Sequence, residues 1–158
     1  MEKLWLSSYP EGVPENITPP PFNSLKDLIE SSLVKYSERT AYSNMGATLT
    51  FKQLDEMSLN FACYLQQDLK LKKGDRVAIM LPNILQYPVA LCGILRAGLV
   101  VVNVNPLYTP RELKHQLRDS GAQSIIILDN FAHVLAEIID DTSVEQVILT
   151  KVGDLLSF

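Results

Sequence analysis

The residues best placed for chemistry lie in a short turn, residues 103–109, between an apolar run and an amphipathic segment. Asn105 and Tyr108 offer polar groups in this turn, and Pro106 and Pro110 stiffen its backbone. In open α/β sheets, ligands bind outside the carboxyl ends of the strands, where such a turn would lie. The residues alone leave two interpretations open: a ligand-binding turn, or a rigid connector that only aims the following helix.

Other side chains with catalytic or ligating chemistry are isolated from one another. The sequence has neither GxGxxG nor GxxxxGK[ST], and residues 82–84, which follow the first apolar run, include no glycine to cradle a phosphate. His115 and His133 have no carboxylate or nucleophile at a supporting offset. Arg96 and Arg111 could serve an anion, although arginines near helix ends are usually solvated or paired. We therefore predict no metal site and no catalytic residue within this sequence.

The elements that would position the turn alternate regularly between residues 76 and 150. Thr109 and Gly121 are a cap and a stop for the helix that follows the turn. The expected strands are residues 76–81, 99–104, 124–128 and 144–149, and the expected helices between them are residues 88–97, 110–120 and 131–139. This alternation predicts an α/β fold with a mostly parallel sheet and right-handed crossovers. Because the strands are continuous apolar runs, helices should cover both faces of the sheet.

Different elements precede this unit. Residues 1–23 are rich in proline and predict an extended arm, which Trp5 and Leu6 could pin onto the body. Ser24 caps a first helix, and residues 41–50 predict a hairpin that turns at Gly46. A long helix is expected over residues 52–69. The core-facing side chains would be Leu25, Leu28, Ile29, Leu33 and Tyr36 in the first helix, and Leu54, Met57, Phe61, Tyr64 and Leu65 in the long helix.

The composition limits the classes of function. With 47% hydrophobic residues, 158 residues can bury a core, and a net charge of −4 argues against binding to nucleic acid. Cys63 and Cys92 lie among apolar residues and predict two buried free thiols. No run approaches the roughly 18 apolar residues of a membrane span, and no signal peptide is visible. We expect a cytoplasmic protein, and peripheral contact with the inner face of a membrane stays open.

Several segments resemble the adenylate-forming superfamily of acyl-CoA synthetases, luciferases and nonribosomal adenylation domains. Residues 49–54, LTFKQL, are similar to the first core motif, Leu-Thr-Tyr/Phe-x-x-Leu. Residues 95–106 are similar to the second, Leu-Lys/Arg-Ala-Gly followed by a strand that ends in proline. Residues 105–116, together with 80–88 and 5–10, are very similar to bacterial long-chain fatty acid–CoA ligases. The likeness covers essentially all 158 residues in order.

The resemblance implies a parent enzyme that uses ATP and Mg²⁺ to turn a fatty acid into an acyl-adenylate and then passes the acyl group to coenzyme A. The family's Ser/Thr/Gly-rich phosphate loop, Thr-Glu pair, ribose-binding aspartate and catalytic lysine have no counterpart in residues 1–158. The resemblance thus implies an N-terminal fragment, with residues 24–158 as a partial subdomain, that is inactive and binds no cofactor alone. It also implies that Asn105, Pro106, Leu107 and Tyr108 lie near the nucleotide of coenzyme A.

Two other interpretations of the same residues stay open. The chain could be a stand-alone α/β module that binds a nucleotide or coenzyme A, or an interaction subunit of a split enzyme. A sheet that ends after its fourth strand leaves an unpaired edge, so we also expect the chain to self-associate. Strand order and acyl chain-length preference do not follow from the sequence.

Overall fold

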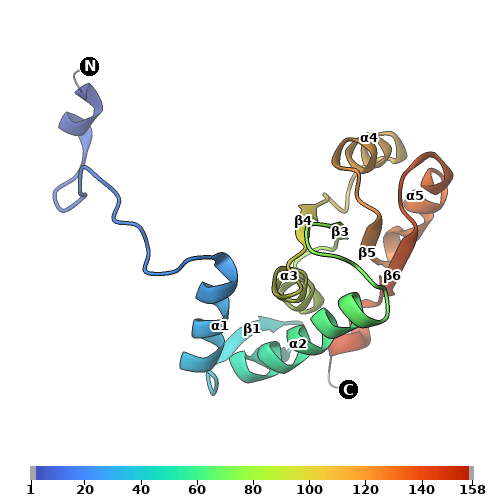
Figure 1. The fold of residues 1–158 in the computed structure, drawn as a ribbon, viewed down its shortest axis with the longest axis horizontal. Helices are drawn as coiled ribbons and strands as arrows, with labels where there is room; N and C mark the ends of the chain where they lie inside the picture. The colour runs from blue at the N-terminus through green and yellow to red at the C-terminus, as the bar shows by residue number, and fades with distance from the viewer. Residues whose placement is uncertain (1–2, 157–158) are drawn as a thin grey trace.

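A four-stranded parallel sheet forms the centre of the computed structural model, which describes residues 3–156 (Figure 1). The strands lie in the order β4 (Val100–Asn103), β3 (Arg76–Met80), β5 (Ser124–Leu128) and β6 (Gln146–Thr150), and every neighbouring pair is parallel. The predicted α/β fold with a parallel sheet is therefore confirmed. The order, which the sequence left open, places β3 and β5 in the middle.

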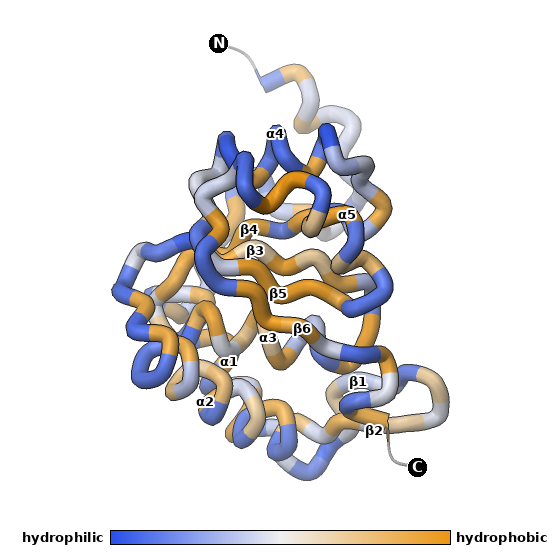
Figure 2. The backbone as a smooth tube through the Cα atoms, turned by 90° about the vertical axis from the view of Figure 1, so that its right-hand side faces the viewer, coloured by the Kyte–Doolittle hydropathy of each residue, from blue (hydrophilic) through white to orange (hydrophobic). Residues whose placement is uncertain are grey.

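Helices cover both faces of this sheet (Figure 2). On one face, α2 (Phe51–Gln67) and α3 (Gln86–Arg96) bury Leu65 and Ile94 against Ile79 of β3. On the other face, α4 (Pro110–Ser120) and α5 (Ala132–Ala136) bury Leu113 against strand residues such as Ile127. Successive residues of a strand point to opposite faces, so one apolar strand supplies both cores.

The two outer strands differ from the prediction of continuous buried runs. All five residues of β5 are buried, whereas Val100 of β4 is 44% exposed and Leu149 of β6 is 58% exposed. The reason is the strand order, because β4 and β6 are the edges of the sheet and are only partly covered. The helix predicted over residues 131–139 is also shorter: α5 is flanked by the 3-10 helices η2 (Asp129–Phe131) and η3 (Ile139–Asp141).

A helix and a hairpin precede the sheet, as predicted. Ser24 caps α1 (Leu25–Lys35), because its Oγ accepts a hydrogen bond from the N–H of Asp27 at 3.1 Å. The strands β1 (Thr40–Asn44) and β2 (Ala47–Thr50) pair in an antiparallel hairpin. Met45 and Gly46 both have positive φ, 48° and 84°, which suits a tight two-residue hairpin turn.

Four side chains of the first two helices that were predicted to be buried are exposed instead. In α1 only Leu33 is buried, while Leu25 is 63% and Leu28 38% exposed. In α2 the buried positions are Leu54, Ser58, Ala62 and Leu65, so the neighbouring Cys63 and Tyr64 lie on the solvent side. Cys92 is buried as expected, and both cysteines are free thiols. Successive helical residues point about 100° apart around the helix axis. A helix that docks with Ala62 against the core therefore turns the next residue, Cys63, toward solvent.

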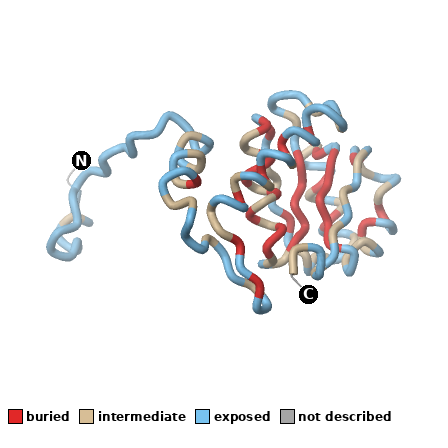
Figure 3. Tube along the Cα trace, turned by 90° about the horizontal axis from the view of Figure 1, so that it is seen from below, coloured by how far each residue is buried: buried red, intermediate tan, exposed pale blue. Residues whose placement is uncertain are grey.

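The proline-rich arm projects away from the body (Figure 3). It is not extended throughout, because Leu4–Ser8 form the 3-10 helix η1. Trp5 is 54% exposed, so the prediction that Trp5 and Leu6 pin the arm onto the body is wrong. At the other end of the chain, the 3-10 helix η4 (Val152–Leu155) follows β6. Among the helices of residues 3–156, none combines the length and apolar character that a membrane span requires.

Candidate functional site

The predicted turn joins the carboxyl end of β4 to the start of α4. The side-chain Oδ1 of Asn105 accepts a hydrogen bond from the N–H of Leu107 at 3.0 Å, and the carbonyl of Asn105 accepts one from the N–H of Tyr108 at 3.1 Å. Leu107 is 80% exposed, whereas the half-buried Tyr108 packs against the α4–α5 core. The side chain and the backbone carbonyl of Asn105 thus shape the turn. Leu107 and one side of Tyr108 remain open to a ligand.

A capping box fixes the start of α4 directly after the turn. The hydroxyl of Thr109 accepts the N–H of Glu112 at 3.4 Å, and the carboxylate of Glu112 accepts the N–H of Thr109 at 2.9 Å and its hydroxyl at 2.7 Å. The side-chain and backbone hydrogen bonds from Thr109 hold the pKa of Glu112 below its usual value. Pro110 occupies the first turn of α4, where its missing N–H costs nothing.

The end of β4 is tied to helices on both faces of the sheet. The carbonyl of Asn103 accepts a hydrogen bond from Nε2 of Gln116 in α4 at 2.8 Å. The side-chain Oδ1 of Asn103 accepts one from the hydroxyl of Tyr87 in α3 at 2.9 Å. The sequence indicated a stiff turn through its prolines, and the structure adds these two tertiary bonds.

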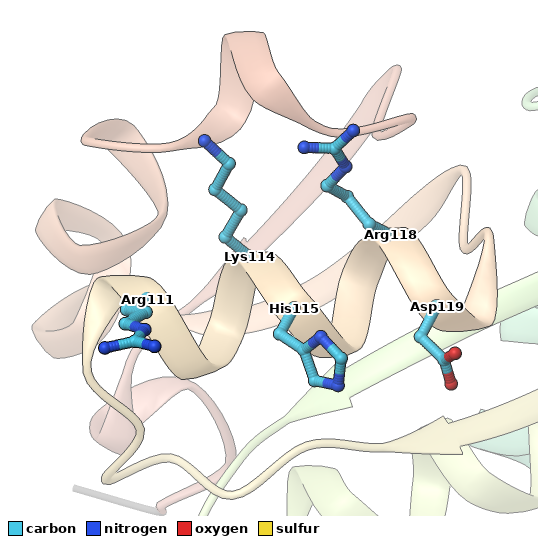
Figure 4. Close-up of a pocket in the computed structure, with 5 residues that line it drawn as sticks. All are labelled: Arg111, Lys114, His115, Arg118 and Asp119. Atoms are coloured by element: carbon cyan, nitrogen blue, oxygen red, sulfur yellow. The ribbon is translucent and has the colours of Figure 1, made fainter.

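The outer face of α4 forms two adjoining hollows beside the turn. One has a volume of about 590 Å³ and places Tyr108 beside Arg111 and His115. The other, of about 480 Å³, shares Arg111 and His115 with the first and adds Lys114 and Arg118 (Figure 4). The spacing of these side chains by three and four residues aligns them along one side of the helix. We call the hollow that Tyr108 lines the α4 hollow.

The α4 hollow can attract an anion, and its charges are mixed. Arg111 and His115 are exposed and supply N–H donors, while Glu112 and Asp119 line the same hollow. In the adjoining hollow, Nζ of Lys114 is bound to the carboxylate of Asp141 at 2.6 Å, and this bond lowers the pKa of Asp141. The sequence singled out Arg111 but missed its grouping with His115 and Tyr108, which the helical spacing could have revealed.

The other candidates from the sequence, Arg96 and His133, lie outside the α4 hollow. The side chain of Arg96 is only 10% exposed, and its Nη1 lies 2.6 Å from Oδ1 of Asp55 and 3.0 Å from Oγ of Ser58. Its Nε lies 3.5 Å from Glu30, so Arg96 joins α3 to α1 and α2 and is not free for an anion. His133 is an exposed residue of α5. Across residues 3–156, no three His, Cys, Asp or Glu side chains gather into a group that could hold a metal.

Comparisons with known proteins agree with this geometry. The chain is 60% identical over 157 residues to the long-chain-fatty-acid–CoA ligase of Escherichia coli O6:H1 and 39% identical to that of Bacillus subtilis 168. Each match covers 99% of this chain and 28% of the relative, so the chain spans just over a quarter of their length.

Solved structures share the fold. A long-chain-fatty-acid–CoA ligase from Archaeoglobus fulgidus matches with a TM-score of 0.76 at 22% identity, covering 88% of this chain and 30% of that one. A benzoate CoA ligase from Burkholderia xenovorans matches with a TM-score of 0.73 at 24% identity, covering 79% of this chain and 25% of that one. The sequence pattern of the family described as AMP-binding enzyme matches residues 29–157. The chain therefore belongs to the AMP-binding enzyme family.

Proposed function

We propose that this chain is the N-terminal part of a long-chain fatty acid–CoA ligase, which converts a fatty acid, ATP and coenzyme A into acyl-CoA, AMP and pyrophosphate. The observation that carries the proposal is the 60% identity over 157 residues to proteins of that name. In this proposal residues 1–23 are an arm and residues 24–158 are part of a subdomain. The parallel sheet and its two helical layers then act as scaffold for chemistry supplied by other segments.

We propose that the chain alone is inactive. The loop after β3 has no glycine-rich phosphate cradle, and its Asn83 carbonyl is bound by the side chain of Asn44 at 3.2 Å. The described residues also offer no cluster of carboxylates for Mg²⁺. These residues do not fit the ATP–Mg²⁺ complex, so we assign no step of adenylation to them. Fatty-acid-dependent pyrophosphate exchange tests the proposal, with the full E. coli ligase as positive control. Exchange above background by the 158-residue chain would refute its inactivity.

We further propose that Asn105, Pro106, Leu107 and Tyr108 form one edge of the coenzyme A site. Two features support this assignment. The end of β4 before the turn is bonded to helices on both faces of the sheet, and the α4 hollow beside the turn combines an aromatic ring with the guanidinium of Arg111 and the imidazole of His115. Arginine and histidine suit the phosphates of coenzyme A, and the open side of the half-buried Tyr108 ring suits a base. Coenzyme A would supply the thiol that accepts the acyl group.

Titration of coenzyme A into the labelled chain tests this assignment through amide shifts of residues 105–111. We expect saturable shifts there, and weaker binding in Arg111→Gln because one phosphate partner is lost. Arg39→Gln removes another exposed arginine, which lies 5.3 Å from the ring centre of Tyr36 and outside the α4 hollow, and should leave the shifts unchanged. Pantetheine, which lacks the nucleotide, should not reproduce them. If coenzyme A gives no saturable shift up to millimolar concentration, the turn is a connector.

We also propose that the chain self-associates. Within residues 3–156, the edge strand β6 has no partner strand on its outer side and exposes Val147 and Leu149, and unpaired strand edges promote pairing with other chains. Light scattering should show dimers or larger species, and a monomer at high concentration would contradict this. We propose a cytoplasmic location for the protein, and vesicle flotation tests peripheral membrane contact.

A further inference from the structure

Asn103 ends β4 two residues before the turn, and both its side chain and its carbonyl are bonded to helices. The side-chain Oδ1 accepts the hydroxyl of Tyr87 at 2.9 Å, and the carbonyl accepts Nε2 of Gln116 at 2.8 Å. The next residue is held within the sheet, because the N–H of Val104 donates to the carbonyl of Ile79 in β3 at 2.9 Å. The end of β4 is thus fixed in three directions, by β3 and by one helix on each face.

Tyr87 reaches this strand end from the helical layer opposite α4 (Figure 1). It is the second residue of α3, and its half-buried ring packs against the core between α2, α3 and the sheet. The buried Gln86 beside it donates to the carbonyl of Lys151 at 2.7 Å, which ties the start of α3 to the segment after β6. The hydroxyl of Tyr87 is therefore presented to Asn103 from a firmly packed helix end.

The position of Asn103 matters for both parts of the proposed coenzyme A edge. Consecutive Cα atoms are about 3.8 Å apart, so a displaced strand end carries Asn105 and the rest of the turn with it. The capping box between Thr109 and Glu112 ties the turn to the start of α4, which carries Arg111. Coenzyme A meets the turn and Arg111 in the right geometry only while the strand end is in place, so its affinity depends on the fraction of molecules in that arrangement.

We propose that Tyr87 is a positioning residue for coenzyme A, which it serves through Asn103 without touching the ligand. The inference rests on the coenzyme A edge proposed above and names a residue outside that edge. Gln116 makes the corresponding bond from α4, but it also lines the α4 hollow, so its substitution would change the site wall and the strand end together. Tyr87 lines a different hollow, of about 220 Å³, between β1 and the loop after β3. A substitution at Tyr87 therefore tests the position of the strand end by itself.

Tyr87→Phe removes the hydroxyl and keeps the ring in the core. The lost bond joins two neutral groups, so coenzyme A should bind about two- to fivefold more weakly, measured from the amide shifts of residues 105–111. Without ligand, the amide of Val104 should exchange with solvent faster than in the wild type, because the strand end opens more often. Tyr42→Phe is the matched control and should change neither value, since it removes another hydroxyl from the hollow that Tyr87 lines and leaves both bonds to Asn103 in place.

Asn103→Ala completes a double-mutant cycle, because it removes Oδ1 and keeps the carbonyl that Gln116 binds. If Tyr87 acts through Asn103, each single variant and the double variant should lose about the same affinity for coenzyme A, since each lacks the same bond. Losses that multiply in the double variant would refute the inference. So would a Tyr87→Phe chain that is less stable in urea but binds coenzyme A as the wild type does, and in both cases the coenzyme A edge stands. If the wild type gives no saturable shift, the coenzyme A edge and this inference both fail.

Discussion

The contact between α2 and α3 depends on the absence of a side chain at Gly93, and Gly93→Ala tests this dependence. A Cβ at Gly93 would lie 2.7 Å from Cδ1 of Phe61, 3.1 Å from the carbonyl oxygen of Ser58 and 3.2 Å from Cβ of Phe61. The ring of Phe61 could turn aside, but the Ser58 carbonyl belongs to the backbone of α2 and moves only with that helix. The substitution therefore strains the interface of two helices that together cover one face of the sheet.

The expected cost follows from two opposing effects. Overpacking of this kind costs about 1–3 kcal/mol. Alanine is the better helix former, and recovers about 1 kcal/mol in a helix interior. The net loss in the free energy of unfolding should be about 1 kcal/mol, which for a chain of this length lowers Tm by ~3 °C. Urea unfolding followed by circular dichroism measures it.

A double-mutant cycle with Phe61→Ala locates the strain. Phe61→Ala removes the ring contact but leaves the Ser58 carbonyl and the Cβ of residue 61 in place, so Gly93→Ala should keep most of its cost and the two substitutions should couple by less than about 0.5 kcal/mol. If Gly93→Ala instead stabilises the protein by about 1 kcal/mol in both backgrounds, only helix propensity is at work, and the close approach of α2 and α3 is wrong.

Three further predictions concern the capping box and the cysteines. Thr109→Ala should lower the free energy of unfolding by about 1 kcal/mol in a urea titration, because α4 loses its N-cap; no change would mean that the cap is not formed. In a carboxyl NMR titration, Glu112 should titrate below its ordinary pKa in the wild type and return to it in Thr109→Ala. Because folding depresses this pKa, the stabilising contribution is present above the unfolded pKa and is lost as pH falls through the folded pKa. A thiol reagent should modify the exposed Cys63 quickly in the folded protein, but Cys92 only on unfolding, since burial both shields its thiol and raises its pKa; equal rates would contradict the packing of α3.

Local signals in the sequence were sufficient to predict several elements. The bounds of α4 follow from Thr109 and Pro110 at its start and Gly121 at its end, because caps act within one turn of helix. The run of residues 124–128 is β5 with the predicted bounds. The exposure of Cys63 in α2 and of Leu149 in β6 was not predictable in this way. It depends on which face of α2 docks and on the strand order, and both are set by contacts distant in sequence.

The same distinction applies to the candidate site. The sequence identified the turn, because prolines and a strand end are local features. The grouping of Arg111 and His115 beside Tyr108 was available from helical spacing alone. The hydrogen bond from Tyr87 to Asn103 was not, because it joins residues on two elements whose relative position only the folded sheet determines.

The two bonds to Asn103 have a consequence for the entropy of ligand binding. Gln116 and Tyr87 hold one strand end from opposite layers, so the β4–α4 junction cannot shift without breaking contacts to both helices. A loop that is free before binding must lose conformational freedom when it closes on a ligand, whereas this junction has already lost that freedom during folding. Any ligand that uses the turn therefore meets a preorganised surface, and its affinity should depend little on ordering of the backbone there.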